Sequence, residues 1–120
     1  GFSGMLPTDA DHVDQRLREL SETLGPELVT ELIGMFRTDG SAQLLDLRSA
    51  HDRRDYKAMQ SGAHRLLGSV LLLSARHLAQ LCRKLELLAR QKEDTGAEPA
   101  LLELESEFAA LLSFVSRPTP

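Results

Sequence analysis

The sequence predicts an all-α fold: an antiparallel up-and-down four-helix bundle with an additional helix at the N-terminus. Good helix formers dominate the composition, whereas aromatic residues make up only 4% of the chain and tryptophan is absent, so strands have little to be built from. Apolar residues recur every three or four positions in several segments. The breaks between these segments are short, which favours antiparallel neighbours.

The first helix is expected over about residues 11–24. Its apolar side chains form one stripe, namely Val13, Leu17, Leu20 and Leu24. Asp9 or Asp11 can cap its N-terminus, because a carboxylate accepts hydrogen bonds from the free N–H groups of a first turn. Gly25 and Pro26 then end it.

Two more helices are expected before residue 52, as one kinked unit. The second starts at Pro26, which suits a first helical turn, and has apolar residues at helical spacing, Leu28, Leu32, Met35 and Phe36. Asp39 and Gly40 interrupt it. The third covers about residues 41–51, with Leu44, Leu47 and Ala50 directed inward. Charged residues 52–55 form a turn, and Asp55 can cap the next helix.

The rest of the chain is expected to hold three helices. The fourth covers about residues 56–73 and the fifth about 75–92, with Ser74 between them as cap and hairpin point. After a polar loop at residues 93–99, the sixth covers about 100–115, with inward Leu101, Leu104, Phe108, Leu111 and Leu112. The kinked unit and these three helices would form the bundle, with the first helix across one end.

The length of 120 residues and the hydrophobic content of 42% fit a single domain with one compact core. We expect this domain over residues 5–120, with a helical core at about 11–115, because residues 1–4 before Met5 resemble an expression-tag remnant. The single cysteine excludes a disulfide framework and a thiolate metal cluster, and it fits a reducing, cytoplasmic compartment. Cys82 lies on the inward face of its helix, so we expect a packed thiol.

Charge, hydropathy and histidine spacing argue against nucleic-acid binding, a membrane-spanning helix and a metal site. A net charge of −4, with basic residues spread among acidic ones, argues against nucleic acid. No apolar run approaches the ~20 residues that a membrane-spanning helix needs. His12, His51 and His77 stand at no chelating spacing from each other, so we expect solvated imidazoles and no metal site.

One histidine on the fourth helix differs from the others. The apolar stripe of this helix comprises Tyr56, Met59, Ala63, Leu66, Val70 and Leu73. At about 100° per residue, His64 points roughly 130° away from the middle of that stripe, toward solvent. Gly68, one turn away, is disfavoured by about 1 kcal/mol relative to alanine, and bare backbone there would let another protein's active site approach. Leu67 and Leu71 are either a docking surface or peripheral core.

These residues resemble the histidine phosphotransfer (HPt) family. Residues 63–69, Ala-His-Arg-Leu-Leu-Gly-Ser, and residues 73–75, Leu-Ser-Ala, are similar to its A-H-x-L-K-G-S and L-G-A segments. Residues 78–90 resemble its L-x-x-L-C-x-x-L-E-x-x-A-R helix, and weaker similarity extends over about residues 11–115. Two positions depart from the pattern: Leu67 replaces the usual lysine, and Ser74 replaces a glycine.

The resemblance implies a phosphorelay intermediate without kinase activity, either free-standing or part of a hybrid sensor kinase. Nε2 of His64 would take a phosphoryl group from the aspartate of one response-regulator receiver domain and pass it to another. We expect a monomer that needs no cofactor of its own, since the Mg²⁺ would belong to the receiver. Site support would come from residues around His64 or on the next helix, namely Gln60, Ser61, Arg65, Gly68, Lys84 and Arg90.

Two roles at the site remain open. Gln60 or an ordered water could accept a hydrogen bond from Nδ1 of His64. Arg65, Lys57, Lys84 or Arg90 could supply the counter-charge that Leu67 lacks. The main alternative function is a degenerate HPt-like interaction module that docks a receiver without efficient phosphotransfer, and the remaining one is a purely structural bundle.

Overall fold

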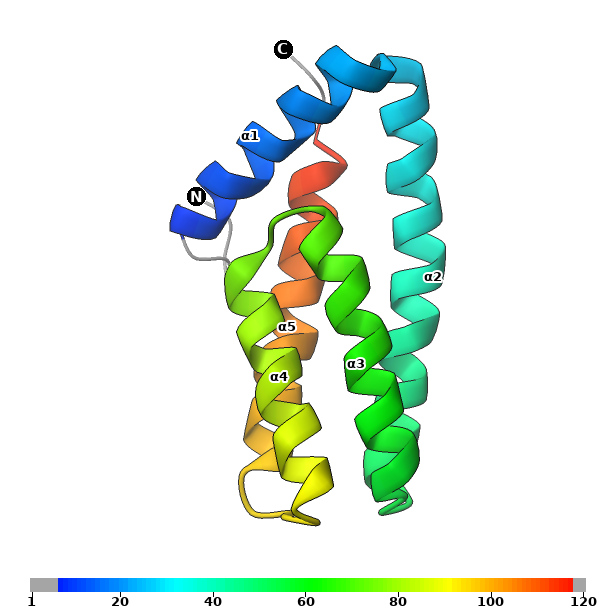
Figure 1. Ribbon diagram of the computed structural model, residues 1–120, viewed down its shortest axis with the longest axis vertical. Coiled ribbons are helices and arrows are strands. Elements are labelled where there is room, and N and C mark those ends of the chain that lie inside the picture. Colours follow the sequence, from blue (N-terminus) through cyan, green and yellow to red (C-terminus); the bar gives the residue numbers. More distant parts are fainter. Residues whose placement is uncertain (1–6, 118–120) are drawn as a thin grey trace.

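The computed structural model describes residues 7–117, which form five helices and no strand (Figure 1). The helices are α1 Pro7–Leu24, α2 Pro26–Asp52, α3 Tyr56–Leu72, α4 Arg76–Arg90 and α5 Ala97–Val115. In Figure 1, α2 to α5 run up and down along the long axis, while α1 lies obliquely near the end where α3 turns into α4. This arrangement confirms the predicted bundle with an additional N-terminal helix. The predicted tag remnant at residues 1–4 lies outside the described residues.

The predicted break at Asp39 and Gly40 is wrong, because α2 is one continuous helix of 27 residues. Gly40 is buried, and a Cβ atom built there would lie 2.7 Å from Cζ of Phe108 on α5. The ring of Phe108 also packs on Phe36, with 5.5 Å between centroids. The glycine therefore allows an aromatic ring to approach α2 closely and does not mark a turn.

Asp9 has a different role from the predicted one. It lies inside α1, which begins at Pro7, and its buried carboxylate accepts a hydrogen bond of 2.9 Å from the backbone N–H of His77. His77 is in the first turn of α4, so Asp9 caps a distant helix. This contact attaches α1 to the start of α4.

The two later helix starts also differ from expectation. Ser74 lies in the α3–α4 hairpin with a positive φ of 58°, but the residue before α4 is Ala75, which makes no side-chain cap. Ser74 is therefore the hairpin point and not the cap. Helix α5 begins at Ala97, ahead of the expected residue 100. Pro99 lies in its first turn, where a missing N–H leaves no hydrogen bond unmade.

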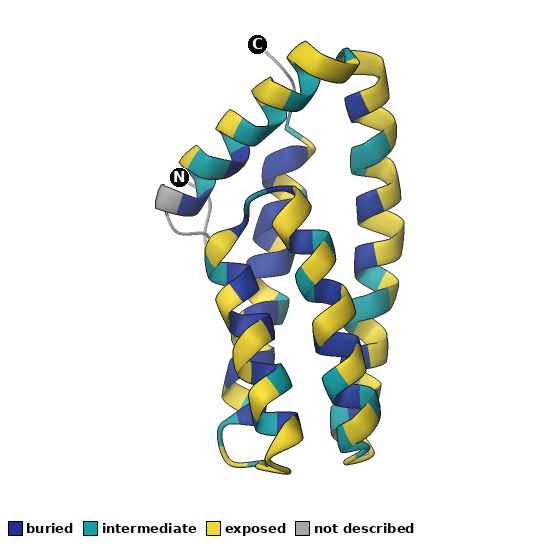
Figure 2. Cartoon of the chain, viewed as in Figure 1, coloured by how far each residue is buried: buried dark blue, intermediate teal, exposed yellow. Residues whose placement is uncertain are grey.

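The core lies where α2 to α5 face each other (Figure 2). Its largest fully buried side chains from these helices are Leu47, Met59, Leu66, Val70, Leu78, Cys82, Leu85, Leu101, Leu104 and Leu111. Burial raises the pKa of the Cys82 thiol to about 12, which confirms a packed and unreactive cysteine. On α2, Val29 and Phe36 are buried, whereas Leu28 and Met35 from the predicted apolar pattern are exposed.

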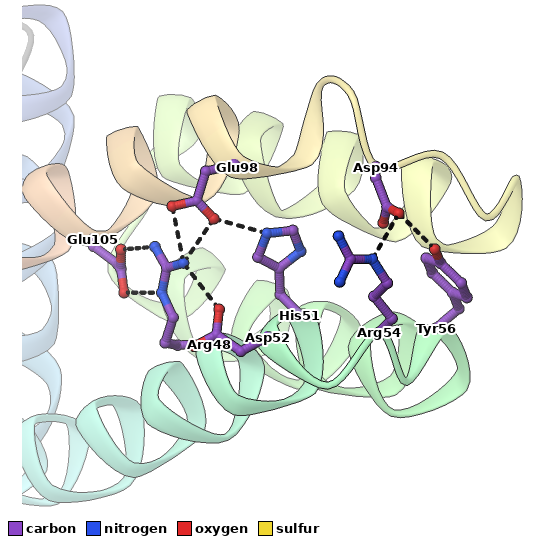
Figure 3. A network of polar contacts seen from close by, with 8 residues as sticks. All are labelled: Arg48, His51, Asp52, Arg54, Tyr56, Asp94, Glu98 and Glu105. Carbon is purple, nitrogen blue, oxygen red and sulfur yellow. Dashed lines mark hydrogen bonds and ion pairs between the residues drawn. The ribbon is translucent and has the colours of Figure 1, made fainter.

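A polar network fixes the C-terminal part of α2 to α5 (Figure 3). Arg48 binds Glu98 at 2.8 Å and Glu105 at 2.5 Å, and His51 Nε2 lies 2.8 Å from the same Glu98. These contacts raise the pKa of Arg48 above its ordinary value and lower that of Glu98, in both cases mainly through their side-chain hydrogen bonds. The expectation of a solvated imidazole is therefore wrong for His51, whose side chain is 11% exposed.

A second part of the network joins the two loops at that end of the bundle. Asp94, which precedes α5, accepts a hydrogen bond of 2.9 Å from the hydroxyl of Tyr56 and one of 3.2 Å from Arg54 (Figure 3). Asp55 caps α3 as predicted, with its side chain accepting from the backbone N–H of Ala58 at 3.1 Å. The N-terminus of α3 is therefore held by contacts within its own turn and from the opposite loop.

Candidate functional site

His64 lies in the middle of α3 on the surface of the bundle, with 72% of its side chain exposed. Its neighbours Ala63 and Leu66 are buried in the core, so the helix is anchored on one side and presents the imidazole on the other. The predicted outward direction of His64 is therefore observed. An exposed, neutral imidazole is a nucleophile that a partner protein can reach.

The contact at Nδ1 comes from the next helix. Oε1 of Glu86 on α4 lies 3.3 Å from Nδ1 of His64, and Glu86 is only 18% exposed. Because an ionised carboxylate can only accept a hydrogen bond, its position favours a proton on Nδ1 and a free lone pair on Nε2. Glu86 is therefore a further candidate acceptor at Nδ1, beside the Gln60 or ordered water expected from the sequence.

Arg90 extends this contact. Its Nη2 lies 3.9 Å from the same Oε1 of Glu86, one helical turn along α4. Lys84, the other basic residue predicted to support the site from α4, is about 200° around the helix from Glu86. Arg90 therefore lies on the side of α4 that faces His64, whereas Lys84 is directed away from it.

The outer face of α3 changes character at His64. Toward the N-terminus it carries exposed Lys57 and Ser61, exposed Arg65 follows His64 directly, and toward the C-terminus it carries exposed Gly68 and Leu71. Such a face offers a partner a basic half and an apolar half on either side of the nucleophile.

The apolar half is open above Gly68. A Cβ atom added to Gly68 would meet no heavy atom within 4 Å, so the glycine leaves bare, accessible backbone one turn from His64. Leu71 is 43% exposed, as a docking residue must be, whereas Leu67 is half-buried and packs against the core. Of the two predicted docking residues, only Leu71 is free of a packing role in the core.

The basic half contains an open hollow of about 350 Å³, lined by Asp55, Lys57, Ala58, Ser61 and Arg65. Neither Lys57 nor Arg65 forms an ion pair or hydrogen bond with any of residues 9–117. The Asp55 side chain caps α3 and also lies 3.8 Å from Arg53. The two cations therefore remain available to an anionic group near His64.

His77 is half-buried and not solvated as expected. Its Nδ1 lies 2.6 Å from Glu107 and its Nε2 lies 3.7 Å from Glu103, both on α5. The hydrogen bond to Glu107 raises the pKa of His77. Since the two ring nitrogens face different carboxylates, the arrangement suits an ion-paired imidazolium.

Comparisons with known proteins agree with this geometry. The sequence profile of the Hpt domain family matches residues 31–114. The crystal structure of a histidine-containing phosphotransfer protein from maize, ZmHP2, is similar with a TM-score of 0.76 and 25% sequence identity, covering 93% of this chain and 80% of that chain. Comparison with curated protein sequences gave no significant match. Among the described residues 7–117, no helix has the length and hydropathy needed to cross a bilayer.

Proposed function

Because this chain belongs to the Hpt domain family, we propose that it relays a phosphoryl group between receiver-domain aspartates through His64. Family membership supports a phosphotransfer role in general. The observation that supports the specific proposal is the pairing of an exposed imidazole with the carboxylate of Glu86 at Nδ1, because this pairing favours a free, reactive lone pair on Nε2.

The proposed reaction is a displacement at phosphorus. The Nε2 lone pair of neutral His64 forms the N–P bond while the P–O bond to the partner's aspartate breaks, and that aspartate leaves as a carboxylate with the bonding electrons. The imidazole becomes a cation that keeps its proton on Nδ1. Glu86 is placed to stabilise this cation, and transfer to a second receiver reverses the same steps.

The chain supplies the nucleophile and its orientation, whereas the receiver supplies the acidic pocket and the Mg²⁺ ion. No step needs a metal, nucleotide or kinase centre in this chain. We therefore propose response-regulator receivers, alone or within a hybrid sensor kinase, as its partners. A reducing compartment such as the cytoplasm suits the free thiol of Cys82.

A docking module that binds receivers without efficient transfer is the second candidate, and Leu67 favours it. This residue is half-buried and uncharged one turn from His64, so position 67 adds no cation for the phosphoryl group. The Leu71 surface would still bind a partner.

The test is transfer of radiolabelled phosphate from a panel of phosphorylated receivers to the full chain. We expect label on the wild type that is labile in acid and stable in base, as a phosphohistidine is, and no label on His64→Gln. If a receiver binds but none transfers label, the docking-module function replaces the relay. Leu67→Lys measures how much the missing cation slows the transfer.

A further inference from the structure

We propose that Lys57 and Arg65 hold the phosphoryl group on His64 and provide the positive charge that Leu67 does not. This inference rests on the proposed function, since it concerns the phosphorylated form of the same histidine. The sequence offered four candidate cations, and the structure distinguishes among them by position and by existing partners.

The phosphorylated imidazole needs a counter-charge. A phosphoryl group on a side chain carries between one and two negative charges at neutral pH, and its oxygens are strong hydrogen-bond acceptors. Cations placed beside such a group stabilise it in the transferring state as well as in the product. The buried side of α3 offers none, because Ala63 and Leu66 are core residues.

Lys57 and Arg65 both lie on the exposed surface of α3 that carries His64. Lys57 precedes His64 by seven residues, so the two side chains leave α3 in nearly the same direction, about 10 Å apart along the helix, with Ser61 between them. Arg65 follows His64 directly and borders the same hollow as Lys57 and Ser61. His64 itself does not line the hollow, and Asp55 also borders it. A phosphoryl group on His64 would therefore have to lean over the edge of the hollow to meet both cations and the Ser61 hydroxyl.

The other two candidates are less suitable. Arg90 lies 3.9 Å from Glu86, the carboxylate that contacts Nδ1, so its charge is already partly compensated. Lys84 is directed away from α3, as its position about 200° from Glu86 requires. Lys57 and Arg65 have no ionic partner among residues 9–117, and Asp55, which borders the same hollow, contacts Arg53 and the N-terminus of α3 instead.

The experiment separates phosphoryl binding from receiver docking by using two donors. The small donor phosphoramidate transfers its phosphoryl group with loss of ammonia and makes no protein interface. A phosphorylated receiver makes both the transfer and the interface. Labelling rates of His64 are measured with each donor for the wild type, Lys57→Gln, Arg65→Gln and the double variant. All of these positions are exposed, and circular dichroism checks that each variant folds.

With phosphoramidate we expect each single substitution to slow labelling of His64 roughly fivefold and the double substitution roughly twentyfold, because each removes one nearby surface charge. Adding Leu67→Lys to the double variant should restore much of the rate. The differences should shrink at high ionic strength. Lys84→Gln is the matched control, a lysine-to-glutamine change on the far side of α4, and should label as the wild type does.

The inference would be overturned by wild-type labelling of the double variant with phosphoramidate, by a loss confined to the receiver donor, or by an equal loss in Lys84→Gln. Arg83→Gln tests the remaining exposed cation near Glu86, and a loss there with none in the double variant would also overturn it. If phosphoramidate labels His64 but no receiver does, the proposed relay function is wrong. The phosphoramidate labelling rates of the Lys57 and Arg65 variants still decide this inference. If neither donor labels His64, both proposals fail.

Discussion

Glu86 and His64 belong to the two arms of the α3–α4 hairpin, and their side chains meet at 3.3 Å between Oε1 and Nδ1. The pairing therefore depends on how the two helices are aligned by the turn at residues 73–75. In the proposed relay this one carboxylate has two effects on the same ring, because it favours a proton on Nδ1 before the reaction and stabilises the imidazolium after it.

Replacing Glu86 should change the imidazole itself and not only the fold. Glu86→Leu removes the acceptor at Nδ1, so we expect a larger population of the tautomer with the proton on Nε2. Transfer to His64 should slow about tenfold, the equivalent of losing roughly 1.4 kcal/mol of stabilisation. The ¹⁵N chemical shifts of His64 report the tautomer, and labelling by phosphoramidate reports the rate.

Glu86→Gln is the matched control for that change. Its amide oxygen still accepts a hydrogen bond from Nδ1, so the tautomer should stay as in the wild type while the charge is lost. A Glu86→Leu protein with wild-type ¹⁵N shifts and wild-type labelling would show that Glu86 has no positioning role.

We expect Gly68 to serve the access of a partner to His64 and not the stability of the helix. Because a Cβ atom there meets nothing within 4 Å, Gly68→Ala should stabilise the protein by about 0.5–1 kcal/mol. The added side chain should nevertheless slow transfer from a receiver, and the longer Gly68→Gln should slow it further, since both fill the open surface beside His64. Urea unfolding measures the stability, and labelling by a phosphorylated receiver measures access.

Gly34 provides the control for this prediction. It is also an exposed glycine inside a helix with open space around its Cβ position, but it lies on α2. Gly34→Ala should give a similar gain in stability with an unchanged transfer rate. Fast transfer to Gly68→Gln would mean that receivers do not approach His64 over Gly68.

Gly40 should respond in the opposite direction to the same substitution. The methyl group of Gly40→Ala would lie 2.7 Å from Cζ of Phe108, a ring already packed on Phe36, so the protein should lose about 1–3 kcal/mol of stability. In a Phe108→Leu background the loss should be smaller, because the clashing atom is gone. A Gly40→Ala protein that unfolds at the wild-type urea concentration would contradict the close packing of α2 on α5.

The two glycines also show what the sequence could and could not predict. Periodicity is a local property, so it was sufficient to predict the helical class, the buried stripe of α3 and the outward direction of His64. A glycine can allow either a turn or a close contact with another helix, and the sequence alone does not distinguish these roles. Gly40 was therefore predicted to break α2. Only the position of Phe108, far along the chain, determines which of them applies.

The partners of His64 and Asp9 were missed for a similar reason. Glu86 lies on a different helix, and its contact depends on the register of the α3–α4 hairpin, which the pattern of either helix alone does not contain. The one available signal was that His64 and Glu86 stand at similar distances in sequence from the hairpin turn. Asp9 was assigned to its own helix because the local rule for caps does not consider a distant backbone N–H such as that of His77.

The contacts of His77 predict that the protein becomes less stable as the pH rises above neutrality. The hydrogen bond to Glu107 raises the pKa of His77, and the carboxylates of Glu103 and Asp9 act in the same direction. A raised pKa means that the folded state binds the proton more tightly. The resulting stabilisation is complete below the ordinary pKa of about 6.5 and is lost as the pH rises through the raised value.

Glu107 adds to this trend. Its side chain is only 7% exposed, and burial raises its pKa even though His77 opposes that effect, so its ionisation weakens the fold as the pH rises from about 4.5 through the raised value. We expect the free energy of unfolding to fall as the pH rises from about 6.5 through the raised pKa of His77. Urea unfolding between pH 6 and pH 9 measures this loss. His77→Gln should be less stable at pH 6 and should lose less stability over that range, and a His77→Gln protein with the wild-type pH profile would show that the His77–Glu107 pair does not control it.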